Sequence, residues 1–335
     1  MSTSRIASLK RKLGIAVAGS VAAASLAAAP AHAAVNGTIY ANGLNTPGGG
    51  VWMGSHLWVS DHVSGLCRLD KNATTGKFTI NAATCSLPVA SVGQPSFDAA
   101  TNSVYVPDNS SKGTTVARLK FDPVSETVRP SASISVGAFG ARPSSTALGP
   151  DGSLYVGFTR GNNLVRVANP ASAPSASLVG TTAAGGAAGL AVANASDGSL
   201  APALYVAEGG GVSEIDNPAA CAGSCAAFMT NIVPQTVVNG KVILWETTAI
   251  AATDANTLYV AKWAPHDFGP KVTIVQDTIS TGSVVDYSTS YTAPDGKLQP
   301  WTTVSSLSAN PAGGLFVGHD PTNGGTNGAL ISSLP

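Results

Sequence analysis

The sequence predicts an all-β protein, and three features of its 335 residues carry this prediction. No stretch has the apolar spacing of three to four residues that marks an amphipathic helix. Short runs rich in valine, isoleucine, threonine and aromatic residues alternate with turns rich in glycine, asparagine and aspartate. An aromatic residue followed by valine recurs six times at intervals of 47 to 57 residues. The aromatic members of these pairs are Trp58, Tyr105, Tyr155, Tyr205, Tyr259 and Phe316.

Each repeat contains the same predicted elements, as the third one illustrates. A short apolar strand at 146–148 runs into a tight turn at 149–152, the chemistry that joins antiparallel strands. The second strand holds the aromatic–valine pair at 155–156, and further strands follow at 164–167 and 176–180. Four strands in each of six repeats predict a six-bladed β-propeller of four-stranded antiparallel sheets.

The last blade needs a strand from the other end of the chain. The sixth repeat reaches only its third strand, at 329–334. The apolar run at 37–41 can supply the missing fourth strand, and this pairing would remove an exposed sheet edge. We therefore expect one propeller domain over residues 34–335. A solenoid would have a shorter period, and a jelly roll would not repeat.

The first 33 residues have the features of a secretory signal peptide. Four basic residues precede the uncharged run 13–29, and an Ala-His-Ala cleavage site follows at 31–33. No other apolar run reaches the eighteen residues or more of a membrane span. The mature chain is therefore expected to be a monomer exported to the bacterial periplasm or the extracellular space.

The charge balance excludes one class of partner. Without the signal peptide, fourteen basic residues face eighteen acidic ones, a net charge of −4. No run of basic residues is available to hold a phosphate backbone, so nucleic acid is not an expected partner.

The four cysteines are expected to form structural disulfides, which persist in exported proteins. Cys67 lies in a third strand, and Cys85 should lie in the fourth strand beside it, so these two are expected to pair. Cys221 and Cys225 would then close the short loop "CAGSC". A metal or redox role is the alternative, but no histidine flanks these cysteines.

Propeller geometry predicts where polar groups converge. The ends of second strands and the starts of first strands meet on one face, around the mouth of the central channel. Three residues past each aromatic, the second strands place Asp61, Asp108, Phe158, Glu208, Lys262 and His319 there. The first strands should add Gln94, Arg142, Trp245, Glu246 and Trp301.

Carboxylates at this mouth suggest a metal site. Oxygen ligands suit calcium or another hard divalent cation. The candidate ligands are Asp61, Asp108, Glu208 and Glu246.

Each carboxylate also has a structural interpretation. Asp61 and Asp108 can accept hydrogen bonds from turn amides, or pair with an arginine on the next strand. Glu246 can form a salt bridge with Arg142 or Lys262.

Three histidines follow second strands in blades one, five and six, which are neighbours in a closed ring. Three imidazoles on one face could bind copper or zinc, or one could act as a general base. They are His62, His266 and His319. The alternative is that they are solvated loop residues.

The strings "LWVSDHVSGLCRLD", "VYVPDNSSKGTTVARLKFD" and "LYVAEGGGVSEID" resemble the repeats of NHL propellers and, more loosely, the six-bladed gluconolactonase and regucalcin-like family. The resemblance implies a metal that polarises a carbonyl and activates water. Phe158, Lys262 and His319 stand where the repeat would have an acid. The paired histidines of virginiamycin B lyase-like propellers are absent, so that activity is not inferred.

Three functions follow as hypotheses. The first is an exported, non-enzymatic propeller that binds a partner protein or a small ligand at its loop-bearing face, because no complete catalytic set is visible. The second is a metal-dependent hydrolase or lyase of the lactonase type. The third is a copper- or zinc-binding exported protein. No cofactor other than such a metal is expected.

Overall fold

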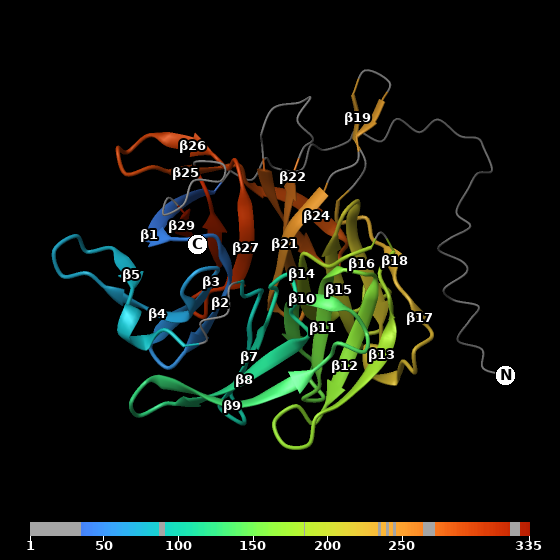
Figure 1. Ribbon diagram of the computed structural model, residues 1–335. Coiled ribbons are helices and arrows are strands. Elements are labelled where there is room, and N and C mark those ends of the chain that lie inside the picture. The colour runs from blue at the N-terminus through green and yellow to red at the C-terminus, as the bar shows by residue number, and fades with distance from the viewer. Residues whose placement is uncertain are drawn as a thin grey trace, which may run out of the picture.

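The computed structural model describes residues 35–335 in eight segments. These are 35–86, 91–183, 185–233, 236–238, 241–243, 246–263, 272–321 and 329–335. Sheets are arranged around a ring, and only two short 3₁₀ turns interrupt the strands of the described part (Figure 1). Residues 1–34, which include the predicted signal peptide, lie outside the described residues, as do Trp245 and His266.

The first three blades are antiparallel sheets in sequence order. Blade one has β2 (Pro47–Met53), β3 (His56–Asp61), β4 (Gly65–Lys71) and β5 (Phe78–Ile80), followed by the turn η1 (Ala82–Thr84). Blade two has β6 (Ser96–Asp98), β7 (Ser103–Pro107), β8 (Thr115–Asp122) and β9 (Thr127–Ser135). Blade three has β10 (Ala141–Leu148), β11 (Leu154–Arg160), β12 (Asn163–Ala168) and β13 (Ser175–Thr181).

The other three blades continue the ring. Blade four has β14 (Gly189–Asn194), β15 (Pro202–Glu208), β16 (Gly211–Asp216) and the two-residue strand β18 (Phe228–Met229), with the turn η2 (Pro218–Ala220) after β16. Blade five has β21 (Glu246–Asp254), β22 (Thr257–Trp263), β23 (Val272–Thr278) and β24 (Ser283–Ser288). Blade six has β27 (Val304–Ala309), β28 (Leu315–His319), β29 (Ala329–Leu334) and β1 (Asn36–Leu44).

Three short additions lie outside this pattern. The strand β17 (Cys225–Ala226) pairs in parallel with β13 and extends blade three. A hairpin of β25 (Ser290–Thr292) and β26 (Leu298–Pro300) pairs with β1. A separate two-stranded hairpin joins β19 (Thr236–Val238) and β20 (Lys241–Ile243). No helix of the described residues is both long and apolar enough to cross a membrane.

The predicted closure of the ring is confirmed. β1 runs antiparallel to β29, with Thr38 opposite Ser333 and Ala41 opposite Ile331. In Figure 1 the blue N-terminal strand and the red C-terminal strand lie side by side. The first strand of the described residues therefore completes the last blade and covers the edge that β29 would otherwise expose.

The recurring aromatic residue is explained by packing between blades. Tyr155 of β11, for example, lies in one buried cluster with Leu204 and Val206 of the next second strand. Phe316 of β28 packs in the same way with Leu57 and Val59 of blade one, so the pattern continues across the closure. Burying an aromatic ring of this kind stabilises the fold by about 2–3 kcal/mol. The repeat seen in the sequence is thus the repeat of one contact between blades.

Hydroxyl groups join neighbouring blades near the channel. The inner strands are sheet edges, and side-chain hydroxyls satisfy carbonyl groups across four of the blade boundaries. The donors are Ser60, Ser144, Thr247 and Ser305, and the acceptors are the carbonyls of Gly93, Ala187, Glu208 and Pro47 in the same order.

Both disulfides have the pairing expected from the sequence. Cys67 of β4 is bonded to Cys85, and Cys221 is bonded to Cys225. One detail differs, because Cys85 does not lie in the fourth strand β5. It follows η1, where Ser86 forms an isolated bridge with Leu66 of β4. The chain thus reaches β4 a second time after the turn, and this return brings the two sulfurs together.

Candidate functional site

The mouth of the channel holds a cavity of about 370 Å³. Its lining comes from blades one, two, three, four and six, which meet where second strands end and first strands begin. Lining residues from these blades include Pro47, His62, Asn109, Thr159, Glu208 and Ser305. Two of the residues expected on this face, His62 and Glu208, are therefore brought to one cavity, together with Asn109.

The cavity wall combines apolar atoms with hydroxyl, amide, imidazole and carboxylate groups. Ser144 donates to the carbonyl of Ala187 at 2.6 Å, and the Thr159 hydroxyl donates to Asn109 Oδ1 at 2.9 Å. Because these hydroxyls use their hydrogens between blades, their oxygens remain as acceptors for a ligand. Sequence reasoning did not single out these hydroxyls, since serine and threonine are frequent throughout the chain.

His62 is the titratable group best placed for proton transfer in this cavity. Its backbone N–H donates to the carbonyl of Asn45 at 3.1 Å, which fixes the loop after β3. Burial lowers the pKa of His62, Asp61 raises it, and Arg142 lowers it again, so the net pKa is below the ordinary value. The imidazole is therefore neutral near pH 7 and is able to accept a proton.

Asp61 caps a turn. The residue is fully buried, and its carboxylate accepts hydrogen bonds from the backbone N–H groups of Asn45, Val63 and Ser64. Asp108 accepts from the backbone N–H of Ser110 at 3.0 Å. In both cases the aspartate accepts from turn amides, which is the structural interpretation considered above.

The two glutamates have different surroundings. Glu208 is only 1% exposed, and its carboxylate accepts a hydrogen bond from the Ser213 hydroxyl. Glu246 is exposed at the start of β21, opposite Trp263. Lys262, one of its expected partners, lies 3.1 Å from Asp286 in an ion pair.

These carboxylates do not fit a calcium-type ion. Such an ion takes six to eight oxygen ligands, whereas the Asp61 carboxylate is already held by three amides. Within the described segments, no group of three or more His, Cys, Asp or Glu is arranged to hold a metal. No step of a mechanism is therefore assigned to a metal here.

His319 lies inside blade six. Its ring packs against Tyr291 and Trp301, with centroids 4.5 and 4.8 Å away, and Nε2 lies 3.0 Å from the Ser332 hydroxyl. Burial lowers its pKa to about 3, with Asp320 opposing the change. Of the three predicted histidines, His62 faces the mouth, His319 is enclosed in the blade, and His266 lies outside the described residues.

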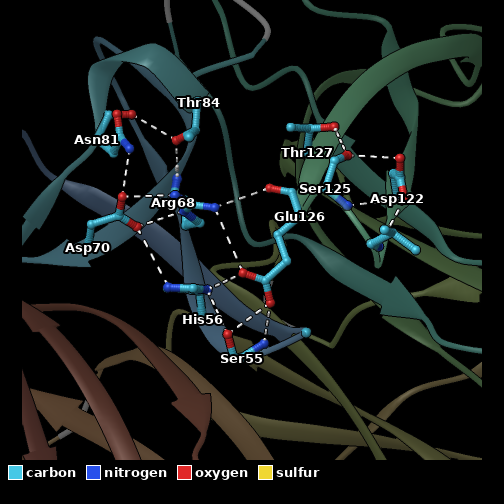
Figure 2. Close-up of polar contacts among 12 residues, drawn as sticks. Ser55, His56, Arg68, Asp70, Asn81, Thr84, Asp122, Ser125, Glu126 and Thr127 are labelled. Atoms are coloured by element: carbon cyan, nitrogen blue, oxygen red, sulfur yellow. Dashed lines mark hydrogen bonds and ion pairs between the residues drawn. The ribbon is translucent and has the colours of Figure 1, made fainter.

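A second polar cluster lies on the opposite face, at the turn between β2 and β3 (Figure 2). Glu126, from the turn between β8 and β9, accepts hydrogen bonds from the Ser55 N–H and hydroxyl at 2.7 and 2.9 Å. Its other oxygen lies 2.6 Å from His56 Nδ1. Arg68 binds Asp70 through two nitrogens, at 2.6 and 2.9 Å. This cluster fastens blade one to blade two, and its groups are bonded to one another.

The sheets and the channel mouth define the chain as a β-propeller. It is similar to the solved structure of a gluconolactonase-like protein, with 14% identity, a TM-score of 0.56, and coverage of 91% of this chain and 93% of that chain. It is also similar to the PQQ-bound aldose sugar dehydrogenase of Streptomyces coelicolor, with 15% identity, a TM-score of 0.53, and coverage of 89% and 96%.

A third similar structure is the virginiamycin B lyase of Staphylococcus aureus, with 13% identity, a TM-score of 0.52, and coverage of 87% of this chain and 94% of that chain. No protein-family model matches the sequence. No curated protein matches it either. At these identities the likeness shows the fold alone.

Proposed function

We propose that the chain is an exported propeller enzyme that hydrolyses a small cyclic ester at the channel mouth, with His62 as the proton acceptor. The observation that carries this proposal is a neutral imidazole facing a cavity of about 370 Å³ whose wall offers hydroxyl and amide groups. A cavity of this size and polarity suits a small, uncharged, oxygen-rich molecule. The two disulfides and the signal-like residues 1–33 support export.

The comparisons add support of a general kind. The similar propellers are named as a lyase, a sugar dehydrogenase and a gluconolactonase-like protein, and each name is that of an enzyme or an enzyme-like protein. A lactonase-type hydrolysis needs a base, a water molecule and polar groups that orient the substrate. The described residues of the mouth provide the base and the orienting groups.

The proposed reaction is the hydrolysis of a lactone by one water molecule. His62 accepts a proton from water while the water oxygen attacks the ester carbonyl carbon. The bond between that carbon and the ring oxygen then breaks, and the ring oxygen receives the proton from the imidazolium. The product is an open-chain hydroxycarboxylic acid, which ionises at neutral pH. The Asn109 amide and the wall hydroxyls would orient the substrate.

The hypothesis of a protein-binding platform has less support from the surface. Large exposed apolar side chains of the described part come from five separate turns and strands. They are Val63, Val124, Leu200, Met229 and Leu298. Binding of copper or zinc stays a prediction, because one of its three histidines lies outside the described residues.

The test compares His62→Gln with the wild type on a panel of γ- and δ-lactones. We expect turnover by the wild type in the presence of a chelator, and a loss of about a hundredfold in kcat for His62→Gln. His56→Gln, on the opposite face, is the matched histidine control and should keep the wild-type rate. Unchanged turnover by His62→Gln, or no turnover of any lactone by the wild type, would refute the proposal.

A further inference from the structure

A second cavity lies beside blade six, apart from the channel mouth. Its volume is about 390 Å³, which is large enough for a small molecule, and it shares no lining residue with the first cavity. The hairpin of β25 and β26, which projects from the periphery of the ring in Figure 1, forms most of its wall. Thr302, before β27, and Pro321, after β28, complete the described lining. An element outside the four-strand pattern of the blades therefore builds this cavity.

The base of the second cavity is firmly packed. Tyr291 is only 4% exposed, and its ring packs against Trp301 and His319, with centroids 5.1 and 4.5 Å away. Trp301 Nε1 donates to the Ser288 hydroxyl at 3.0 Å, which fixes the indole. Because these neighbours cover most of the Tyr291 ring, its hydroxyl end is the part that reaches the cavity.

The wall combines apolar rings with oxygen atoms that accept hydrogen bonds. The Thr302 hydroxyl donates to the carbonyl of Asp320 at 3.2 Å, so its own oxygen remains available as an acceptor. Among the described lining residues, Asp295 is the one charged group, and no lysine, arginine or histidine is present. A ligand that matches this wall has an apolar ring and a positively charged donor. The apolar rings are those of Pro294, Pro300 and Pro321.

Asp295 already holds an ammonium group from its own chain. Its Oδ1 accepts from the Lys297 N–H at 3.1 Å, and its Oδ2 lies 3.5 Å from Lys297 Nζ. The two side chains are 53% and 77% exposed, so this ion pair contributes little and is easily exchanged. Burial raises the pKa of the Tyr291 hydroxyl, and the charge of Asp295 raises it further. The carboxylate and this hydroxyl are therefore close enough to act on one cation.

We propose that the second cavity binds organic ammonium ions that carry an apolar ring, with Asp295 as the anionic contact. The ammonium group of the ligand displaces Lys297 and donates to the Asp295 carboxylate and the Tyr291 hydroxyl. The apolar ring lies against the prolines, a contact that the exposed Lys297 side chain does not make, and this contact favours the ligand. The cavity is separate from the channel mouth, so the inference does not depend on the proposed hydrolysis.

The test measures binding by calorimetry with benzylammonium chloride and with benzyl alcohol, its uncharged counterpart of similar shape. The wild type should bind benzylammonium about fivefold more tightly, the difference expected for one partly exposed ion pair. Asp295→Asn should abolish this preference. Asp254→Asn is the matched control and should keep the wild-type affinities. Asp254 is also an exposed aspartate whose Oδ1 accepts the N–H two residues further along the chain.

Two further variants should act in opposite directions. Lys297→Gln removes the competing ammonium group, so it should tighten benzylammonium binding by about threefold and leave benzyl alcohol binding unchanged. Tyr291→Phe keeps the packed ring but removes the hydroxyl, so it should weaken benzylammonium binding by about threefold. The proposal is refuted if the wild type binds neither compound, or binds both equally. It is also refuted if Asp295→Asn keeps the preference for the ammonium ion, or if Lys297→Gln binds it no more tightly than the wild type.

Discussion

The side chain of Gln94 is hydrogen-bonded to the backbone of Leu190 in both directions. Nε2 donates to the Leu190 carbonyl at 2.9 Å, and the Leu190 N–H donates to Oε1 at 3.0 Å. Gln94 precedes the first strand of blade two, whereas Leu190 lies in the first strand of blade four. The amide therefore reaches past blade three and pairs with the inner edge of β14, so that one side chain joins two blades that are not neighbours.

Gln94→Ala should destabilise the ring. It leaves the N–H and carbonyl of Leu190 without these partners, and we expect the free energy of unfolding to fall by about 1–3 kcal/mol. Urea unfolding measures the change. Gln299→Ala, at an exposed glutamine of β26, is the control and should be neutral. A Gln94→Ala protein as stable as the wild type would show that water replaces the amide without cost.

His319→Gln should change stability and its pH dependence. The lowered pKa of about 3 means that the unfolded chain binds a proton more readily than the folded chain between about pH 6.5 and pH 3. The His319 contribution to stability is therefore lost as the pH falls through this range. We expect His319→Gln to be less stable at pH 7 by about 1–3 kcal/mol, with a shallower loss below pH 6.5. Unfolding curves measured across this pH range give both quantities, and an unaltered pH slope would contradict the expectation.

Much of the fold could be predicted from the sequence because each repeated feature has a repeated physical cause. The aromatic–valine pair marks a second strand whose ring packs on the next blade, and Phe316 keeps this contact across the closure. The candidate site could be predicted less completely from the sequence. "GHD" places His319 at a strand end, but a sequence does not show that its ring is enclosed by Tyr291 and Trp301.

Glu126→Gln should weaken the contact between blades one and two. Burial raises the pKa of Glu126, but hydrogen bonds from Ser55 and the proximity of His56 outweigh this, so the pKa lies below its usual value of 4.5. The stabilisation is present above pH 4.5 and is lost as the pH falls through the folded-state pKa. We expect a loss of about 1 kcal/mol at pH 7 and a smaller decline on acidification.

The Glu126→Gln experiment is a pair of acid titrations of unfolding, with Glu246→Gln as the control at an exposed glutamate. The control should match the wild type in its free energy of unfolding at pH 7. Equal stability of Glu126→Gln and the wild type at pH 7 would mean that the contact seen in Figure 2 contributes nothing to the fold.

Asp277→Asn should stabilise the protein at neutral pH. Asp277 of β23 is only 6% exposed, and its Oδ1 has no hydrogen-bond partner among the described residues. Burial raises its pKa from 3.8 to about 6, so the folded state binds the proton more readily than the unfolded state. The free energy of unfolding therefore declines as the pH rises from about 4 to about 6. The neutral amide should raise the free energy of unfolding at pH 7.5 by about 1–2 kcal/mol and flatten this decline. Thermal melts from pH 4 to pH 8 would detect it, and a lower melting temperature at pH 7.5 would count against it.

The pairing of β1 with β29 sets an order for assembly. Blades one to five draw their strands from consecutive stretches of chain, so each can form soon after its own residues leave the ribosome. Blade six unites residues almost three hundred positions apart, such as Thr38 and Ser333, and must wait for the final strand. Until then β1 lacks its antiparallel partner β29, and this interval is when the protein is most exposed to aggregation and proteolysis.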